Sequence, residues 1–171
     1  GAALEAMSQG FHGAGISGSK DQSVANGLPH SKWRVRMKTR ERDEFLSAPH
    51  TAVLATVDAK GRAHAVPVWY LWNGESFEII GGKDSAKMRH LELNGRAAIC
   101  VDRRGEGVQH VTAEGPAELG GTATPEWRLK PYTHYRGREA AEKTVAKGGH
   151  ESQRFLTLTP ERWYAWPDAL K

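Results

Sequence analysis

Residues 51–82 read TAVLATVDAKGRAHAVPVWYLWNGESFEIIGG, and this stretch decides the fold. Its first seven residues are apolar and rich in β-branched side chains, which favours a strand. The segment DAKG is typical of a tight turn, so residues 62–72 are expected to return beside the first strand as a hairpin. A second turn at NGES opens a third strand over residues 77–82. The stretch therefore predicts an antiparallel meander.

The rest of the chain continues this mainly β pattern. Further strands are expected over residues 96–102, 108–119, 153–160 and 162–166, and short helices from Thr39 to near Pro49 and from Ser85 to Leu93. A helical insertion begins at Thr124 and Pro125, which suit the N-cap and the first helical position, and extends to residues 148–149. Six or seven antiparallel strands with few helices predict a small closed or partly closed barrel. No GxGxxG fingerprint or parallel βαβ rhythm occurs, which argues against a Rossmann domain.

Length and composition indicate one folded domain with an arm. Residues 1–31 are rich in Gly, Ser and Ala and lack a period of 2 or 3.6, which predicts a flexible N-terminal arm, with a cloning remnant before Met7. Residues 32–171 form the expected domain. No run approaches the roughly 18–20 apolar residues of a membrane span. The single cysteine, Cys100, permits no internal disulfide, so we expect a cytoplasmic protein.

Positive residues occupy every second position at the start of the domain. They are Lys32, Arg34, Arg36, Lys38, Arg40 and Arg42. In an extended segment, all six would lie on one side. Two interpretations stay open: a strip that binds a polyanion such as nucleic acid or an oligoglutamate chain, or a solvated linker. The formal net charge of +4 fits either.

The side chains offer no reactive set of their own. The eight histidines show no metal-ligand spacing and no GxSxG motif occurs, so no metal site or catalytic residue is assigned. Cys100 lies in an apolar run and is expected to be a small core residue. Either the chain only binds a ligand, or a cofactor brings the chemistry.

The segment GKDSAKMRHLELNGR, residues 82–96, is the best candidate for a binding site. Two glycines end a strand and let the backbone approach a ligand, and the helix that follows presents free N–H groups and a positive dipole end. Ser85 can donate a hydroxyl bond, and Lys87 and Arg89 add positive charge. A phosphate fits this arrangement, although a solvated helix start is the alternative.

Taken together, AVLATVDAKGRAHAVPVWYLW, FEIIGGKDSAKMRHLELNGRAAI, VTAEGPAEL and LTPERWYAW resemble the pyridoxamine-5′-phosphate-oxidase-like, FMN-binding split β-barrel superfamily, and especially its branch of deazaflavin (coenzyme F420)-dependent reductases. The resemblance covers roughly residues 45–170. It implies an antiparallel Greek-key split β-barrel with short helices. It also implies a homodimer with the cofactor in the groove between two barrels.

The resemblance further implies a set of cofactor-binding residues. These are His64, Pro67, Val68, Trp69, Gly82, Lys83, Ser85, Lys87 and Arg89. The phosphate would be held by Ser85 and Lys87, and the ring would lie along residues 67–69. Tyr70 and His64 are the nearest candidates for a proton donor. The C-terminal aromatic residues, Trp163, Tyr164 and Trp166, would either seal the dimer or wall the partner's cofactor.

Departures from the oxidases decide the expected activity. The chain has Ala86-Lys87 where they carry Arg-Lys, and Ile80-Gly81 where they carry Tyr-Thr, so vitamin B6 oxidase activity is not expected. The expected function is an oxidoreductase that passes a hydride from C5 of reduced F420 to a small unsaturated organic acceptor. An FMN-dependent oxidoreductase, a non-catalytic flavin-binding or haem-binding barrel, and a structural barrel with a nucleic-acid-binding arm are the alternatives. Membrane and nucleic-acid partners are not favoured.

Overall fold

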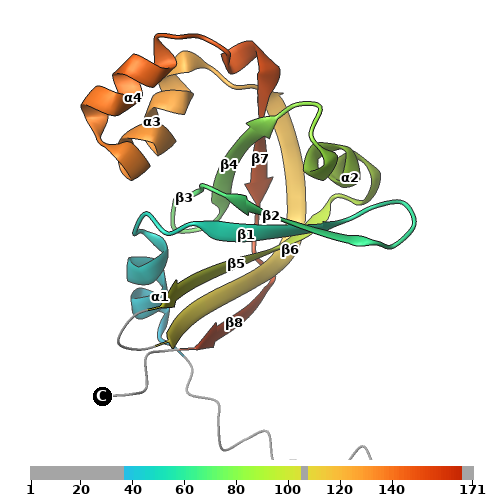
Figure 1. Cartoon of the computed structure of the whole chain (residues 1–171). Helices are drawn as coiled ribbons and strands as arrows, with labels where there is room; N and C mark the ends of the chain where they lie inside the picture. Colours follow the sequence, from blue (N-terminus) through green and yellow to red (C-terminus); the bar gives the residue numbers. More distant parts are fainter. Residues whose placement is uncertain (1–36, 105–107, 167–171) are drawn as a thin grey trace, which may run out of the picture. The chain divides into compact units, whose positions relative to one another are not determined.

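Eight antiparallel strands curl into a split β-barrel (Figure 1). The computed structural model describes residues 37–104 and 108–166, which belong to one compact unit, Val35–Lys171. The strands are β1 Ala52–Val57, β2 Ala63–Val68, β3 Leu71–Trp72, β4 Phe77–Gly82, β5 Arg96–Arg104, β6 Val108–Thr122, β7 Gln153–Leu158 and β8 Arg162–Trp166. Their order is β2-β1-β5-β6-β7-β4-β3, and β8 pairs with β6. The predicted barrel is therefore confirmed, while the predicted arm lies outside the described residues.

The helices also lie where the sequence predicts them. They are α1 Thr39–Leu46, α2 Ala86–Asn94, α3 Pro125–Arg136 and α4 Arg138–Val145, with a short 3-10 turn at His150–Ser152. The Thr124 hydroxyl accepts the N–H of Trp127 at 3.2 Å, so it caps α3 as expected. Figure 1 shows α3 and α4 side by side as the insertion between β6 and β7.

The predicted meander is only partly right: both turns form hairpins, but residues 62–72 do not make one continuous strand. The return strand expected over residues 62–72 divides into β2, which pairs with β1, and β3, which pairs with β4. Strand β4 pairs with β7 and not with β2. The division falls at Trp69 and Tyr70, where hydrogen bonds to a side chain take the place of strand pairing. The Tyr135 hydroxyl of α3 accepts the N–H of Tyr70 at 3.2 Å and donates to the carbonyl of His50 at 2.7 Å.

Replacing Tyr135 by Phe should destabilise the fold, because the substitution leaves the buried Tyr70 N–H without a partner. An unsatisfied buried group costs about 1–3 kcal/mol. At about 2–4 °C per kcal/mol for a chain of this size, the melting temperature should fall by roughly 2–12 °C. Tyr132→Phe is the matched control, because the Tyr132 hydroxyl makes no hydrogen bond within residues 37–104 and 108–166. Equal thermal stability of the two variants would show that Tyr135 does not hold this junction.

Strand β6 serves both halves of the barrel. Its first half pairs with β5 and β8, and its second half pairs with β7. The chain passes from β7 to β8 directly over Gly115, where Thr159 N–H donates to Pro116 O at 3.0 Å and Glu161 N–H donates to Glu114 O at 2.9 Å. A Cβ at Gly115 would collide with the carbonyl oxygen of Thr159. The crossing therefore requires glycine.

The core lies between the inner faces of the strands. Leu54, Ile79, Ile99 and Leu156 are fully buried, and α2 adds Met88. Alternation along β5 sends Ile99 inward and its neighbour Cys100 outward, so the expectation that Cys100 is a core residue is wrong. Cys100 is half-buried on the outer face of the sheet.

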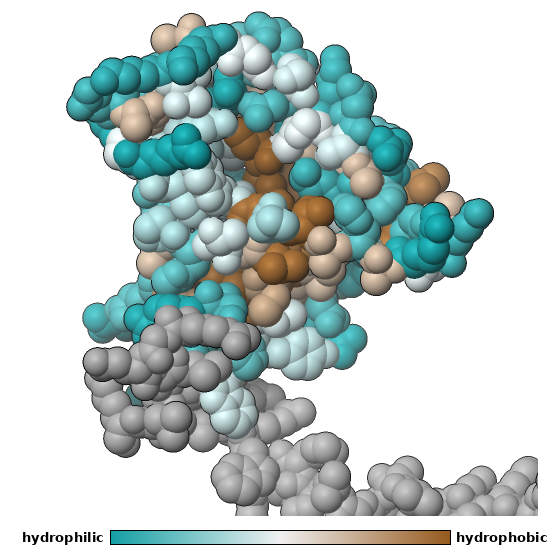
Figure 2. All heavy atoms as spheres, viewed as in Figure 1, coloured by the Kyte–Doolittle hydropathy of each residue, from teal (hydrophilic) through white to brown (hydrophobic). Residues whose placement is uncertain are grey.

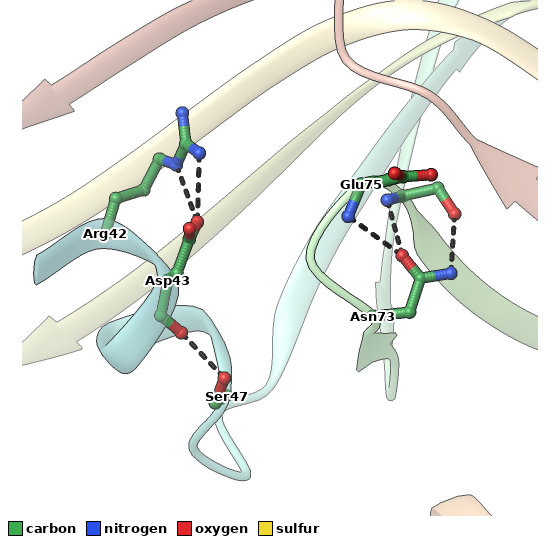
Figure 3. Close-up of polar contacts among 6 residues, drawn as sticks. Arg42, Asp43, Ser47, Asn73 and Glu75 are labelled. Carbon is green, nitrogen blue, oxygen red and sulfur yellow. Dashed lines mark hydrogen bonds and ion pairs between the residues drawn. The ribbon is translucent and has the colours of Figure 1, made fainter. Parts of the chain in front are cut away.

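The described part of the predicted basic strip is helical from Thr39 onward. Arg40 and Arg42 lie in α1, where a spacing of two places them about 200° apart. Arg40 pairs with Glu44 at 2.8 Å. Arg42 donates to the Asp43 carboxylate at 2.9 Å (Figure 3) and lies 4.0 Å from the centre of the Trp163 ring. A single basic face is therefore wrong for these residues; Lys32, Arg34 and Arg36 lie outside the described residues.

The predicted turn at NGES is closed by its asparagine. The Asn73 amide oxygen accepts the N–H groups of Glu75 at 2.9 Å and Ser76 at 2.8 Å (Figure 3). This Asx geometry explains why the hairpin between β3 and β4 can be read directly from the sequence.

Candidate cofactor-binding site

The turn between β4 and α2 is fixed by its backbone. Ser85 N–H donates to Gly82 O at 3.0 Å, and Lys83 N–H donates to Ser152 O at 2.9 Å. Ser85 is the N-cap of α2, yet its hydroxyl makes no capping bond. The hydroxyl oxygen is buried and has no partner among the described residues. A buried hydroxyl without a partner is costly, so this group is available to a ligand at the positive end of the helix.

Lys87 is a half-buried cation in the first turn of α2. Its side chain lies across Gly81, because a Cβ built on Gly81 would be 2.6 Å from Lys87 Cε. Burial lowers the pKa of Lys87 below its ordinary value of 10.5. Its ammonium has no carboxylate partner within residues 37–104 and 108–166. An anion placed here would supply the missing countercharge.

Two other predicted basic residues lie on a different side of the helix start. Lys83 and Arg89 line a depression of about 610 Å³ together with Asp84, Glu92, Gly120, Gly121, Thr122 and Arg154. The Arg89 guanidinium donates to the carbonyl of Asp84. Arg154 donates to Glu92 at 2.8 Å, so much of the positive charge in this depression is already paired. The predicted residues of the turn thus divide into two groups.

The β2 residues of the predicted site point in different directions. His64 is half-buried on the inner side, where its ring meets that of His90 edge-to-face at 5.5 Å. Pro67 is exposed, and Val68 is 8% exposed within the core. Trp69 stacks on Tyr135 with ring centres 4.6 Å apart. The structure therefore brings His64 to α2, whereas Val68 faces the core and Trp69 packs against α3.

Tyr70 is unsuited to proton donation. It is 1% exposed and packs edge-on against Phe77 at 5.3 Å. Burial, and to a smaller extent the neighbouring Tyr135, raise the pKa of Tyr70. Of the two candidate donors, only His64 is partly exposed.

Sequence reasoning missed two residues of this region. The Thr56 hydroxyl of β1 lies 3.0 Å from His90 Nδ1. His90 follows Lys87 by three positions, a spacing that places both on one side of a helix. Thr56 is the polar residue at an inward position of an otherwise apolar strand. These two signals were present in the sequence.

The fold agrees with the family comparison. A family model described as pyridoxamine 5′-phosphate oxidase matches residues 39–167. The chain therefore belongs to this family. No curated protein matches the chain.

Solved structures show the same fold at low sequence identity. A conserved hypothetical protein of Mycobacterium tuberculosis is 20% identical, with a TM-score of 0.66 over 78% of this chain and 87% of that chain. A protein titled F420 reductase is 20% identical, with a TM-score of 0.62 over 71% and 94%. The haem storage protein HutZ of Vibrio cholerae is 20% identical, with a TM-score of 0.57 over 75% and 94%.

Two further classes of feature are not found in the described part of the chain. No helix there is long and apolar enough to cross a membrane. No group of three or more His, Cys, Asp or Glu side chains there could hold a metal ion.

Proposed function

We propose that the protein is an oxidoreductase that transfers a hydride between reduced F420 and a small unsaturated organic acceptor. The observation that carries the proposal is the β4–α2 turn, where an unpartnered buried hydroxyl and an unpaired half-buried lysine lie two residues apart at the positive end of a helix. Such a turn suits the phosphate that F420 and FMN both carry.

The chain's own part in this chemistry is binding and orientation. Ser85 would donate its hydroxyl proton to the phosphate, and Lys87 would neutralise one of its charges. Gly81 gives the Lys87 side chain room to lie across β4. His64 is the group that could hold or donate a proton on the inner side of β2. The cofactor, when bound, would supply the hydride.

The preference for F420 over FMN rests on what the site lacks. Ala86 and Gly81 stand where the oxidases carry additional phosphate ligands, and the oxidases' Tyr-Thr pair is replaced by Ile80-Gly81. FMN is the alternative cofactor. Haem is a further alternative, because two structural neighbours are titled as haem storage and haem-binding proteins.

A titration of the purified protein with F420, FMN and haem tests the proposal. We expect F420 to bind most tightly by fluorescence, and reduced F420 to be oxidised in the presence of an activated alkene. Binding of FMN alone would indicate an FMN-dependent oxidoreductase instead. A strong Soret band with no flavin binding would contradict the proposed reductase.

We also propose a homodimer that forms through the outer face of the sheet. Strand pairing places a set of small and apolar side chains there: Val53, Ala55, Val57, Ala63, Ala65, Pro67, Ala98, Cys100, Tyr164 and Trp166. Val53 is 43% exposed and Tyr164 is 47% exposed. Figure 2 shows apolar residues gathered over β1 and β2. Apolar faces of this kind commonly mark interfaces.

The substitution Val53→Asp should convert the dimer to a monomer, because a buried unpaired carboxylate disfavours association. Sedimentation equilibrium at micromolar concentration should give about twice the chain mass for the parent and the single mass for the variant. Leu93→Asp is the control, because Leu93 is 65% exposed and belongs to α2, not to the strands of this face. A parent that sediments as a monomer would rule out the proposed dimer.

A further inference from the structure

The edge of α2 that carries Lys87 continues into a polar seam with β1. Asn94 Nδ2 donates to the Val57 carbonyl at 2.8 Å, and His90 Nδ1 lies 3.0 Å from the Thr56 hydroxyl. Residues 87, 90 and 94 recur at spacings of three and four, so they share one side of the helix. Lys87 therefore lies about one turn before His90 on this side of the helix, and its side chain reaches across Gly81 of β4.

His90 is held in one orientation by two contacts. Thr56 is 1% exposed and cannot move freely, and its hydroxyl engages Nδ1 of the imidazole. The His64 ring meets His90 edge-to-face at 5.5 Å from the opposite strand. When the Thr56 hydroxyl donates to Nδ1 of the neutral ring, the proton of the imidazole is on Nε2. Nε2 makes no hydrogen bond within the described residues and is available as a donor.

We propose that His90 is a third ligand-binding group of the phosphate site, and that Thr56 positions it by holding Nδ1, which leaves Nε2 free for the ligand. This inference rests on the proposed function, because it assigns a role toward the same phosphate. The arrangement follows a general rule: one ring nitrogen is held by a neighbouring group so that the other faces the ligand. Lys87 supplies charge to the phosphate, and His90 supplies a directional hydrogen bond from the neighbouring helical turn.

The same contacts could serve only to fasten α2 to the sheet. The two roles differ in what they do to ligands. A fastening role would change the affinity for every ligand alike, whereas a phosphate-binding role changes the affinity only for ligands that carry the phosphate. The comparison must therefore use ligand pairs that differ in this group: FMN with riboflavin, and F420 with the deazaflavin that lacks phosphate and tail.

Dissociation constants should be measured by fluorescence for the full-length parent and for Thr56→Val, Thr56→Ser and His90→Gln. We expect His90→Gln to weaken the phosphate-bearing ligand roughly 10-fold, and Thr56→Val roughly 5-fold, as for the loss of one hydrogen bond. Thr56→Ser keeps the hydroxyl and should match the parent. The phosphate-free ligands should bind all four proteins equally.

Two results would overturn the inference in distinguishable ways. In the first, His90→Gln and Thr56→Val bind phosphate-bearing ligands like the parent, or they lose affinity equally for both members of a ligand pair. His90 then does not contact the phosphate, while the proposed function stands. If the parent binds neither F420 nor FMN, the proposed function and the inference both fail. Thermal unfolding of each variant shows whether a loss reflects an unfolded protein, and His90→Gln keeps the test open if Thr56→Val does not fold.

Discussion

Lys87→Ala should weaken the binding of F420 and FMN by roughly 10-fold to 150-fold, which corresponds to the 1.5–3 kcal/mol typical of a hydrogen bond to a charged group. The effect should be large because the Lys87 ammonium is half-buried and has no other countercharge among the described residues. The fold should survive, because Lys87 packs only its flexible side chain against Gly81. Dissociation constants from fluorescence quenching, together with a thermal unfolding curve, measure both quantities.

The pH dependence of binding gives an independent check on Lys87. Burial lowers the pKa of this lysine below 10.5, so the free protein loses the positive charge at a lower pH than an exposed lysine would. Affinity for the phosphate should fall as the pH rises through this lowered pKa, because only the ammonium form attracts the anion. Lys87→Arg should remove that fall, since arginine stays charged. Unchanged affinity of Lys87→Ala at every pH would exclude Lys87 from the site.

Gly115→Ala should lower stability by about 1–3 kcal/mol, the usual cost of overpacking a close contact. The new Cβ would collide with the carbonyl oxygen of Thr159, which is backbone and cannot swing away. At about 2–4 °C per kcal/mol for a chain of this size, the melting temperature should fall by roughly 2–12 °C.

Gly121→Ala is the matched control for this substitution. Gly121 lies in the same strand, and nothing lies within 4 Å of a Cβ built there. Its melting temperature should stay within about 2 °C of the parent, as for most surface changes. If Gly115→Ala is as stable as Gly121→Ala, the crossing of the β7–β8 connection over β6 does not require glycine.

The local elements of the fold could be predicted because their signals are local. The Asp58–Gly61 turn, the Asn73 turn and the Thr124 cap each depend on side chains within a few residues of one another. The order of strands could not be predicted, because β4 pairs with β7, whose sequence lies about seventy residues away. The apolar run 62–72 reads as one strand, and only Tyr135, from the distant α3, shows where it divides.

The site was predictable to a similar extent. Ser85 and Lys87 follow from the strand–glycine–helix pattern, because that pattern puts the N-cap and the first turn of the helix at these two positions. The directions of residues 64–69 depend on strand alternation and on what covers each face, so Val68 in the core and Trp69 against α3 required the structure. The partner of His90, Thr56, lies 34 positions earlier in the chain and becomes its neighbour only when α2 packs on β1.

A crystal structure of the protein with bound F420 tests the central claim most directly. We predict that the phosphate oxygens lie within about 2.7–3.2 Å of the Ser85 hydroxyl and the Lys87 ammonium, at the first turn of α2. A phosphate held instead in the depression of Lys83 and Arg154, with Ser85 and Lys87 making no contact to the cofactor, would contradict the account.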